Sequence, residues 1–159
     1  MVKLRMRRIA GLMLAVALAA PCVASGKADF SGKWVFNASR SKNVGMMSKL
    51  QLVSSIAQTR TALTVSDASN FDGNAQTRET HYDLTGKSVP NESFMGERCQ
   101  TVTRWTGDKL LTLWTSEGAV AGSKTVRTET RYLSADGKTM TLESARGTNP
   151  PVVMLFDKQ

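Results

Sequence analysis

The chain has 159 residues, of which 41% are apolar and 21% are charged. This length suits one domain with one core, and the composition excludes a disordered chain and a multi-span membrane protein. The formal net charge is +8, but four basic residues lie in the first eight positions, so that 17 basic residues remain against 13 acidic ones. A remaining charge of +4 without a basic stripe argues against nucleic acid as a partner.

Residues 1–25 are typical of a signal peptide. A basic start, 3–8, precedes an apolar stretch, 9–20, and Pro21 is followed by small residues. A helix as long as this stretch spans about 18 Å, too short for a hydrocarbon core of about 30 Å, which argues against an uncleaved anchor. The sequence therefore predicts an exported domain over 26–159, periplasmic or secreted, with no stable membrane insertion after signal removal.

The two cysteines predict no disulfide. Cys22 lies in the small-residue run, but Pro21 directly before it does not suit a lipoprotein signal. If Cys22 leaves with the signal peptide, Cys99 is alone in the mature chain. We expect Cys99 to be a buried, reduced and poorly reactive thiol.

From residue 29 onward the dominant hydrophobic period is two, and the chain is rich in threonine, which favours strands. Residues 44–50 could form one short helical turn. The predicted strands are 32–37, 50–57, 61–66, 75–84, 98–105, 109–116, 123–133, 138–145 and 151–157.

Short connections with turn residues, such as Asp136-Gly137, predict that sequence neighbours pair antiparallel. A meander of this length removes its exposed edges by closing on itself. The expected fold is therefore all-β: a single antiparallel up-and-down barrel of about eight or nine strands. A two-sheet sandwich is the alternative.

The alternation within strands divides inner from outer faces. In 123–133 we expect the charged row at 127, 129 and 131 to face water and the opposite row to face inward. The predicted ligand-lining residues are Cys99, Thr101, Thr103, Trp105, Val126, Thr128, Thr130, Tyr132, Met140 and Leu142. Such a mixed inner face of threonines and large apolar groups suits a cavity; alternatively, the hydroxyls bond one another and the barrel is filled.

The first strand contains Gly32-x-Trp34 directly after the export signal, which resembles the lipocalins and the wider calycin group. The segments 30–42 and 133–143 also resemble small exported bacterial proteins of unknown function with a lipocalin-like barrel. The resemblance implies that Trp34 closes the barrel bottom, that Gly32 permits close wrapping, and that a cation near the end of the barrel, best placed at Lys158, covers the indole. The Thr-Asp-Tyr motif and the helix after the barrel are absent, so the ligand class does not transfer.

No constellation for catalysis or metal binding is found in the sequence. His81, the only histidine, shares a predicted outer face, and Glu92 and Glu97 lie in a predicted loop, 88–97. We expect no catalytic residue, no metal and no cofactor.

The expected function is an exported binding protein that holds a small apolar or amphipathic ligand in its barrel. The alternative is a non-enzymatic envelope or secreted interaction or inhibitor protein with a filled barrel. The loop 37–49, with Val44, Met46 and Met47, is predicted to form a lid over one end; alternatively, it packs on the core from below. Nothing in the pattern sets an oligomeric state.

Overall fold

The computed structural model describes residues 26–159. The predicted signal peptide, including Cys22, lies outside the described residues. The strands are β1 Gly32–Phe36, β2 Gln51–Gln58, β3 Ala62–Phe71, β4 Asn74–Asp83, β5 Ser88–Glu92, β6 Arg98–Thr106, β7 Lys109–Glu117, β8 Lys124–Leu133, β9 Thr139–Ala145 and β10 Val152–Lys158. Two short 3₁₀ helices, η1 (Ala38–Arg40) and η2 (Gly45–Lys49), connect β1 to β2.

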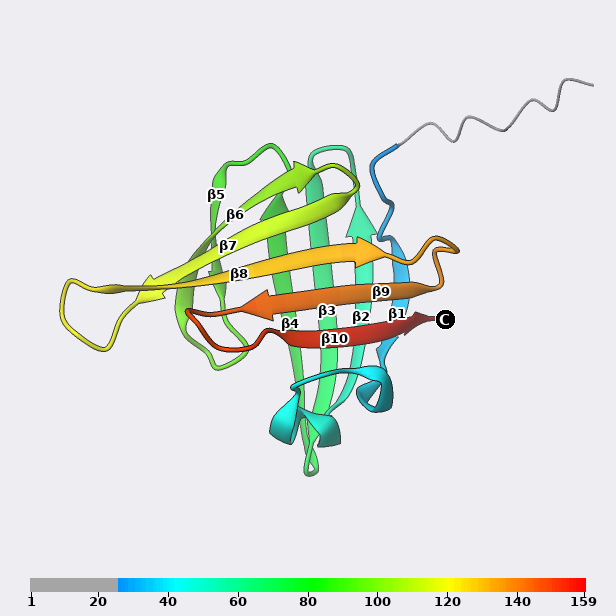
Figure 1. Ribbon diagram of the computed structural model, residues 1–159, viewed down its shortest axis with the longest axis horizontal. Helices are drawn as coiled ribbons and strands as arrows, with labels where there is room; N and C mark the ends of the chain where they lie inside the picture. The colour runs from blue at the N-terminus through cyan, green and yellow to red at the C-terminus, as the bar shows by residue number, and fades with distance from the viewer. Residues whose placement is uncertain (1–25) are drawn as a thin grey trace, which may run out of the picture.

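The strands form one antiparallel sheet in the order β4-β3-β2-β1-β10-β9-β8-β7-β6-β5 (Figure 1). Each ladder joins sequence neighbours except the one between β1 and β10, which brings the first and last strands together. The result is an all-β up-and-down barrel with ten strands, so the expected eight or nine is wrong. The ladder stops at β4 and β5, and the expected full closure is therefore not reached.

The strand missed by the sequence pattern is β5, which falls in the predicted loop 88–97. It contains Pro90, which has no N–H to donate to a ladder. The proline is tolerated because β5 lies at the end of the sheet and pairs only with β6. A short polar segment that contains a proline can therefore form an edge strand that the sequence pattern does not predict.

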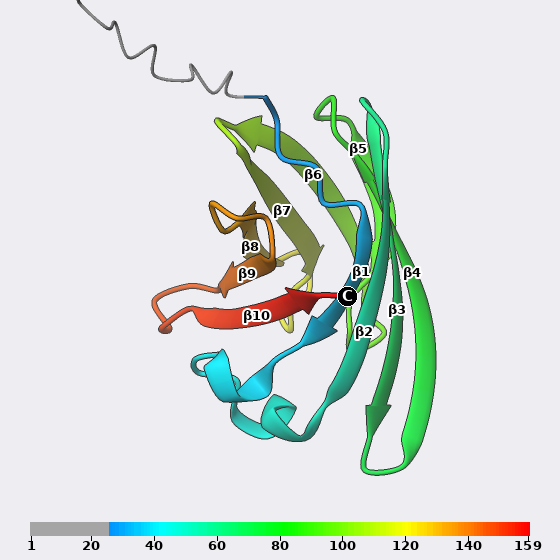
Figure 2. The same cartoon turned by 90° about the vertical axis from the view of Figure 1, so that its right-hand side faces the viewer.

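The barrel has two walls and two different ends (Figure 2). β2, β3 and β4 form one wall and β7 to β10 form the other, while η1 and η2 lie at one end and the first described residues at the opposite end. Within residues 26–159, no helix has both the length and the apolar character that crossing a membrane requires.

The end opposite η1 and η2 is closed by an aromatic plug. Phe30 and Trp34 are fully buried, and the Trp34 indole donates a hydrogen bond to the Phe30 carbonyl at 2.8 Å. Phe30 stacks on Trp105 with ring centroids 6.2 Å apart. The Gln58 carboxamide holds this segment in place, since it accepts the Phe30 N–H at 3.0 Å and donates to the Ala28 carbonyl at 2.9 Å.

The barrel-closing residues expected from the sequence lie together in the structure. Lys158 is the direct register partner of Trp34, and its Nζ lies 5.1 Å from the indole centroid. Gly32 has φ +125°, which disfavours any side chain, and a Cβ there would lie 3.2 Å from the Lys158 Cε. Glycine therefore permits the lysine to lie across the plug.

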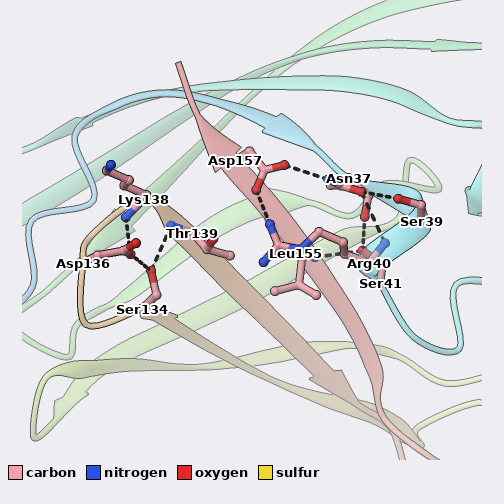
Figure 3. A network of polar contacts seen from close by, with 10 residues as sticks. All are labelled: Asn37, Ser39, Arg40, Ser41, Ser134, Asp136, Lys138, Thr139, Leu155 and Asp157. Atoms are coloured by element: carbon pink, nitrogen blue, oxygen red, sulfur yellow. Dashed lines mark hydrogen bonds and ion pairs between the residues drawn. The ribbon is translucent and has the colours of Figure 1, made fainter.

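A polar network fixes the segment that leaves β1 (Figure 3). Asp157 on β10 accepts hydrogen bonds from the Asn37 amide at 2.7 Å and from Arg40 at 2.6 Å. Ser41 accepts the Leu155 N–H at 2.9 Å, and the Asn37 N–H donates to the Leu155 carbonyl at 2.8 Å. η1 is thus tied to the last strand.

The plug leads to a stability prediction. Trp34→Ala removes a fully buried indole and should lower the free energy of unfolding by about 3–5 kcal/mol. Lys158→Ala loses only a cation–π contact and should cost about 1 kcal/mol. Urea denaturation of both variants and the parent measures this difference. A Trp34→Ala melting temperature equal to the parent's would contradict a closing role for Trp34.

Candidate functional site

The inner face of β8 carries charges, which corrects the sequence prediction. Val126, Thr128, Thr130 and Tyr132 were expected to face inward. Instead Arg131 is the register partner of Leu110, and Arg127 that of Trp114, two buried residues of β7. Since direct register partners share a face of the sheet, the row of Arg127, Glu129 and Arg131 points into the barrel.

The uncharged row therefore lies outside. Val126 is 49% exposed, and Thr128, Thr130 and Tyr132 are half-buried on the outer face. The Lys109 Nζ covers the Tyr132 ring at 4.3 Å. The charged row was assigned to water because burying a charge is costly, but this cost falls when the charges are paired and hydrogen-bonded.

One charged cluster sits on the inner faces of β7 and β8. Glu129 accepts a hydrogen bond from the Trp114 indole at 2.8 Å and pairs with Arg127 at 3.1 Å. The Arg127 guanidinium lies over the same indole, 4.7 Å from its centroid. Glu129, only 8% exposed, is thus held by two donors and compensates the charge of Arg127.

Arg131 differs from Arg127 because it has no acidic partner. It is 8% exposed and forms no ion pair among the described residues, and its Nε has no hydrogen-bond partner. Its guanidinium lies 5.4 Å from the centroid of Tyr82. Burial raises the pKa of Tyr82 to about 12, so this phenol stays neutral and does not balance the charge. Within residues 26–159 Arg131 thus has no direct ion-pair partner, although the Glu129 and Asp67 carboxylates lie near enough to act on the same phenol.

A second charged cluster lies on β3 and β4. Asp67 accepts a hydrogen bond from the Ser54 hydroxyl and pairs with Arg78 at 3.3 Å. Arg78 also lies over the ring of Phe94, 5.3 Å from its centroid. Phe94 belongs to the turn between β5 and β6, so this stack reaches across the interruption in the sheet.

A hollow of about 600 Å³ opens at this place, within the range of small-molecule sites. One side is formed by β3 and β4 and the other by the turn between β5 and β6. Its lining residues are Asp67, Ser69, Phe71, Asn74, Gln76, Thr77, Arg78, Glu92, Ser93, Phe94, Met95 and Gly96. The hollow thus connects the Asp67–Arg78 pair to the solvent.

Four buried side-chain nitrogens of the described chain have no hydrogen-bond partner: Nε of Arg78, Arg127 and Arg131, and the indole Nε1 of Trp105. All four are donors. Buried polar groups in proteins are almost always partnered, so unpaired donors indicate a missing acceptor. All four belong to residues at inner-face positions of the barrel, and each lacks an acceptor from the described part of the protein itself.

The other predicted lining residues do face inward. Cys99, Thr101, Thr103 and Met140 are buried, and Trp105 and Leu142 are half-buried on inner faces. Thr103 shares a hydrogen bond of 2.9 Å with Thr112, and the Thr101 hydroxyl donates to the Val89 carbonyl at 3.1 Å. These hydroxyls are satisfied within the protein, as the filled-barrel alternative expected.

The predicted lid residues divide into two kinds. Val44 and Met47 pack against the core, whereas Met46 is 82% exposed. η2 lies at the end of the barrel away from the plug, the same end as the β3–β4 turn (Figure 1). The segment therefore lies at this end of the barrel, and its role as a lid stays a prediction.

The remaining titratable groups show no arrangement for catalysis. His81 is exposed on the outer face, where it contacts Glu79 at 3.0 Å. Among residues 26–159 there is no group of three or more side chains suited to hold a metal ion.

The residues that the sequence reasoning missed are the charged inner ones: Asp67, Arg78, Arg127, Glu129 and Arg131. The available signal was the alternation of the preceding strand. Leu110 and Trp114 on β7 define an inner face, and antiparallel register across the turn transfers that face to the charged row of β8.

Comparison with known proteins gives structural matches alone. No protein-family model matches the chain, and no curated protein matches it in sequence. Human cRBP IV aligns with a TM-score of 0.62 at 18% identity, covering 83% of this chain and 99% of that one. The REP1-NXSQ fatty acid transporter aligns with a TM-score of 0.63 at 12% identity, covering 81% of this chain and 95% of that one.

Fatty-acid-binding protein 1 of Echinococcus granulosus gives a TM-score of 0.63 at 11% identity, covering 81% of this chain and 96% of that one. Likeness at these identities shows the fold alone. All three share this chain's fold, an antiparallel β-barrel, and a barrel of this kind is what the resemblance in the first strand implied.

The Cys99 thiol should react slowly in the folded protein. Burial raises the pKa of this thiol above its ordinary value, and its Sγ donates to the Glu97 carbonyl at 3.3 Å. Because the thiolate is the nucleophile, labelling by a disulfide reagent at pH 8 should be roughly tenfold or more slower than in urea. The rate should continue to rise with pH beyond the usual thiol range. Rapid native labelling, or a Cys99-linked dimer on a non-reducing gel, would contradict this expectation.

Proposed function

We propose that this chain is an exported, non-enzymatic binding protein whose barrel holds a small amphipathic molecule with an anionic or otherwise acceptor-rich group. The observation that carries the proposal is the excess of donors inside the barrel. Arg131 is buried without an acidic partner, and the four unpartnered buried nitrogens all require an acceptor. Export rests on the sequence of residues 1–25.

The apolar part of the ligand finds contacts next to these donors. Trp114 and Tyr82 pack edge to face with centroids 6.0 Å apart, and Met140 and Phe156 are buried on the neighbouring inner faces. The same barrel thus offers aromatic and aliphatic walls together with a cation. Such an apolar site with a few placed polar groups is typical of pockets for small molecules.

Two of the structural neighbours are a fatty acid transporter and a fatty-acid-binding protein. A fatty acid is a carboxylate on an apolar chain, and it would place acceptor oxygens at a guanidinium and its chain against aromatic walls. A fatty-acid-like anion is therefore the first ligand class to test. Native mass spectrometry of the exported protein, looking for a co-purified acid, tests the proposal directly.

One observation favours the alternative of an interaction protein. Leu113 and Val126 are 42% and 49% exposed on the outer faces of adjacent strands. An outer apolar patch suits contact with another protein. A variant that has lost all ligand binding but still interacts with protein partners as the parent does would support this second function.

Substitution of Arg131 separates a binding role from a structural one. A buried unpaired charge costs stability, so Arg131→Met should leave the free energy of unfolding unchanged or raise it. The same change should weaken binding of the anionic fluorophore 1-anilinonaphthalene-8-sulfonate by roughly tenfold or more, because a hydrogen bond to a charged group is lost. Fluorescence titration and urea denaturation measure the two effects.

The matched control is Arg104→Met, which removes an equal charge from the exposed outer face of β6. It should change the affinity for the anionic probe by less than about twofold, since exposed charges act weakly. Equal losses in both variants would mean that net charge, and not Arg131, determines binding.

The lid expectation is tested with the two methionines of η2. Met47→Ser removes a side chain that packs against the core, and it should weaken binding of the neutral apolar dye Nile red several-fold. Met46→Ser changes a residue that is 82% exposed and serves as the control. Affinities that stay equal to the parent's in both variants would argue against a lid.

A further inference from the structure

The interruption of the sheet leaves one edge of β4 without a strand partner. β4 pairs with β3 along its whole length, and the backbone groups of alternate residues point to that neighbour. The Leu84 N–H just after β4 donates to the Thr61 carbonyl before β3, so the even positions face β3 and the odd ones face the gap. Thr77, Glu79 and His81 therefore direct their N–H and C=O groups toward β5.

A single side chain satisfies one of these residues. The Asn91 amide on β5 donates to the His81 carbonyl at 2.7 Å, and its Oδ1 accepts the His81 N–H at 3.1 Å. An antiparallel pair of residues exchanges the same two bonds through its backbones. The carboxamide thus replaces one residue of the missing ladder. These contacts are named the Asn91 bridge.

A buried threonine fixes the orientation of the Asn91 side chain. The Asn91 Nδ2 also donates to the Thr101 hydroxyl at 2.7 Å, and Thr101 is 1% exposed. That hydroxyl in turn donates to the Val89 carbonyl at 3.1 Å. Both amide hydrogens and the amide oxygen of Asn91 are in use, so the side chain has one preferred orientation.

The bridge lies next to the hollow described above. The chain continues from Asn91 into Glu92 and the turn between β5 and β6, and these residues form one side of the 600 Å³ hollow. From Glu79 toward Asn74, β4 faces this hollow without a bridge of this kind in the described structure. Loss of the Asn91 bridge would extend the opening along β4 toward the Tyr82–Arg131 pair.

We propose that Asn91 holds the gap between β4 and β5 closed at His81 and thereby limits the rate at which ligand enters and leaves the barrel. The ligand part of this inference rests on the proposed function, whereas closure of the gap does not. Asn91 is a positioning residue, because it acts through the backbone of β4.

Amide hydrogen exchange tests the closure without any ligand. The His81 N–H is protected through Asn91, whereas the Glu79 N–H points into the gap with no such bond. In Asn91→Ala, the protection factor of His81 should fall roughly tenfold or more, to within about threefold of that of Glu79. Asn91→Asp keeps the acceptor oxygen and should retain part of the protection.

The matched control is Ser88→Ala on the same strand. The Ser88 hydroxyl bonds Gln100 on the outer face at 3.0 Å and does not contact β4. This variant should keep the parent's protection at His81. An unchanged His81 protection factor in Asn91→Ala, or an equal loss in Ser88→Ala, would overturn the proposal.

Stopped-flow measurements with 1-anilinonaphthalene-8-sulfonate test the effect of Asn91 on the rates at which ligand enters and leaves. Both the association and the dissociation rate of this probe should rise roughly fivefold or more in Asn91→Ala, with little change in affinity, because an opening affects both directions equally. Loss of His81 protection with unchanged rates would refute the role in ligand exchange. If the parent protein fails to bind this probe or any fatty acid, the proposed function fails, while the exchange of the His81 amide still decides whether Asn91 closes the gap.

Discussion

Hydrogen bonding between neighbouring backbones holds this barrel together, and the place where it is interrupted determines the rest of the architecture. The pairing of β1 with β10 joins the first and last strands, so a sheet edge remains elsewhere, between β4 and β5. An exposed edge is a liability, and β5 limits it by being short and by carrying Pro90. Carboxamide side chains supply bonds that backbones do not make, at Asn91 across the gap and at Gln58 beneath the plug.

The two ends of the barrel follow from this arrangement. The end near Trp34 is closed by aromatic rings with a lysine across them. The interrupted side holds the Asp67–Arg78 pair and a hollow. The closed, aromatic end and the hollow thus lie in different parts of the barrel.

The buried charges are the feature that a purely structural core would not keep. Arg127 and Arg78 each form an ion pair with a carboxylate, whereas Arg131 forms none among the described residues. Burying a charge without an ion pair costs stability, so an apolar side chain of similar size at position 131 is expected to fold at least as well. The proposed binding function gives this cation a role that folding does not. The exposed residues around Leu113 bring no comparable cost in stability. For this reason binding inside the barrel is the better supported function.

The sequence by itself determined the elements that depend on local pattern. Alternation and short turns identified nine of the strands, and the resemblance of Gly32-x-Trp34 to the lipocalins implied the closing plug, in which the structure gives Gly32 a positive φ and places Lys158 beside Trp34. Two features depended on the tertiary structure. β5 exists only because β6 pairs with it, and the inner face of β8 was decided by its register with β7, since a row of charges reads as solvent-exposed until its partners are known. Pairing between strands joins residues that are distant in sequence, so local periodicity gives the alternation of a strand but not which of its two faces lies inside.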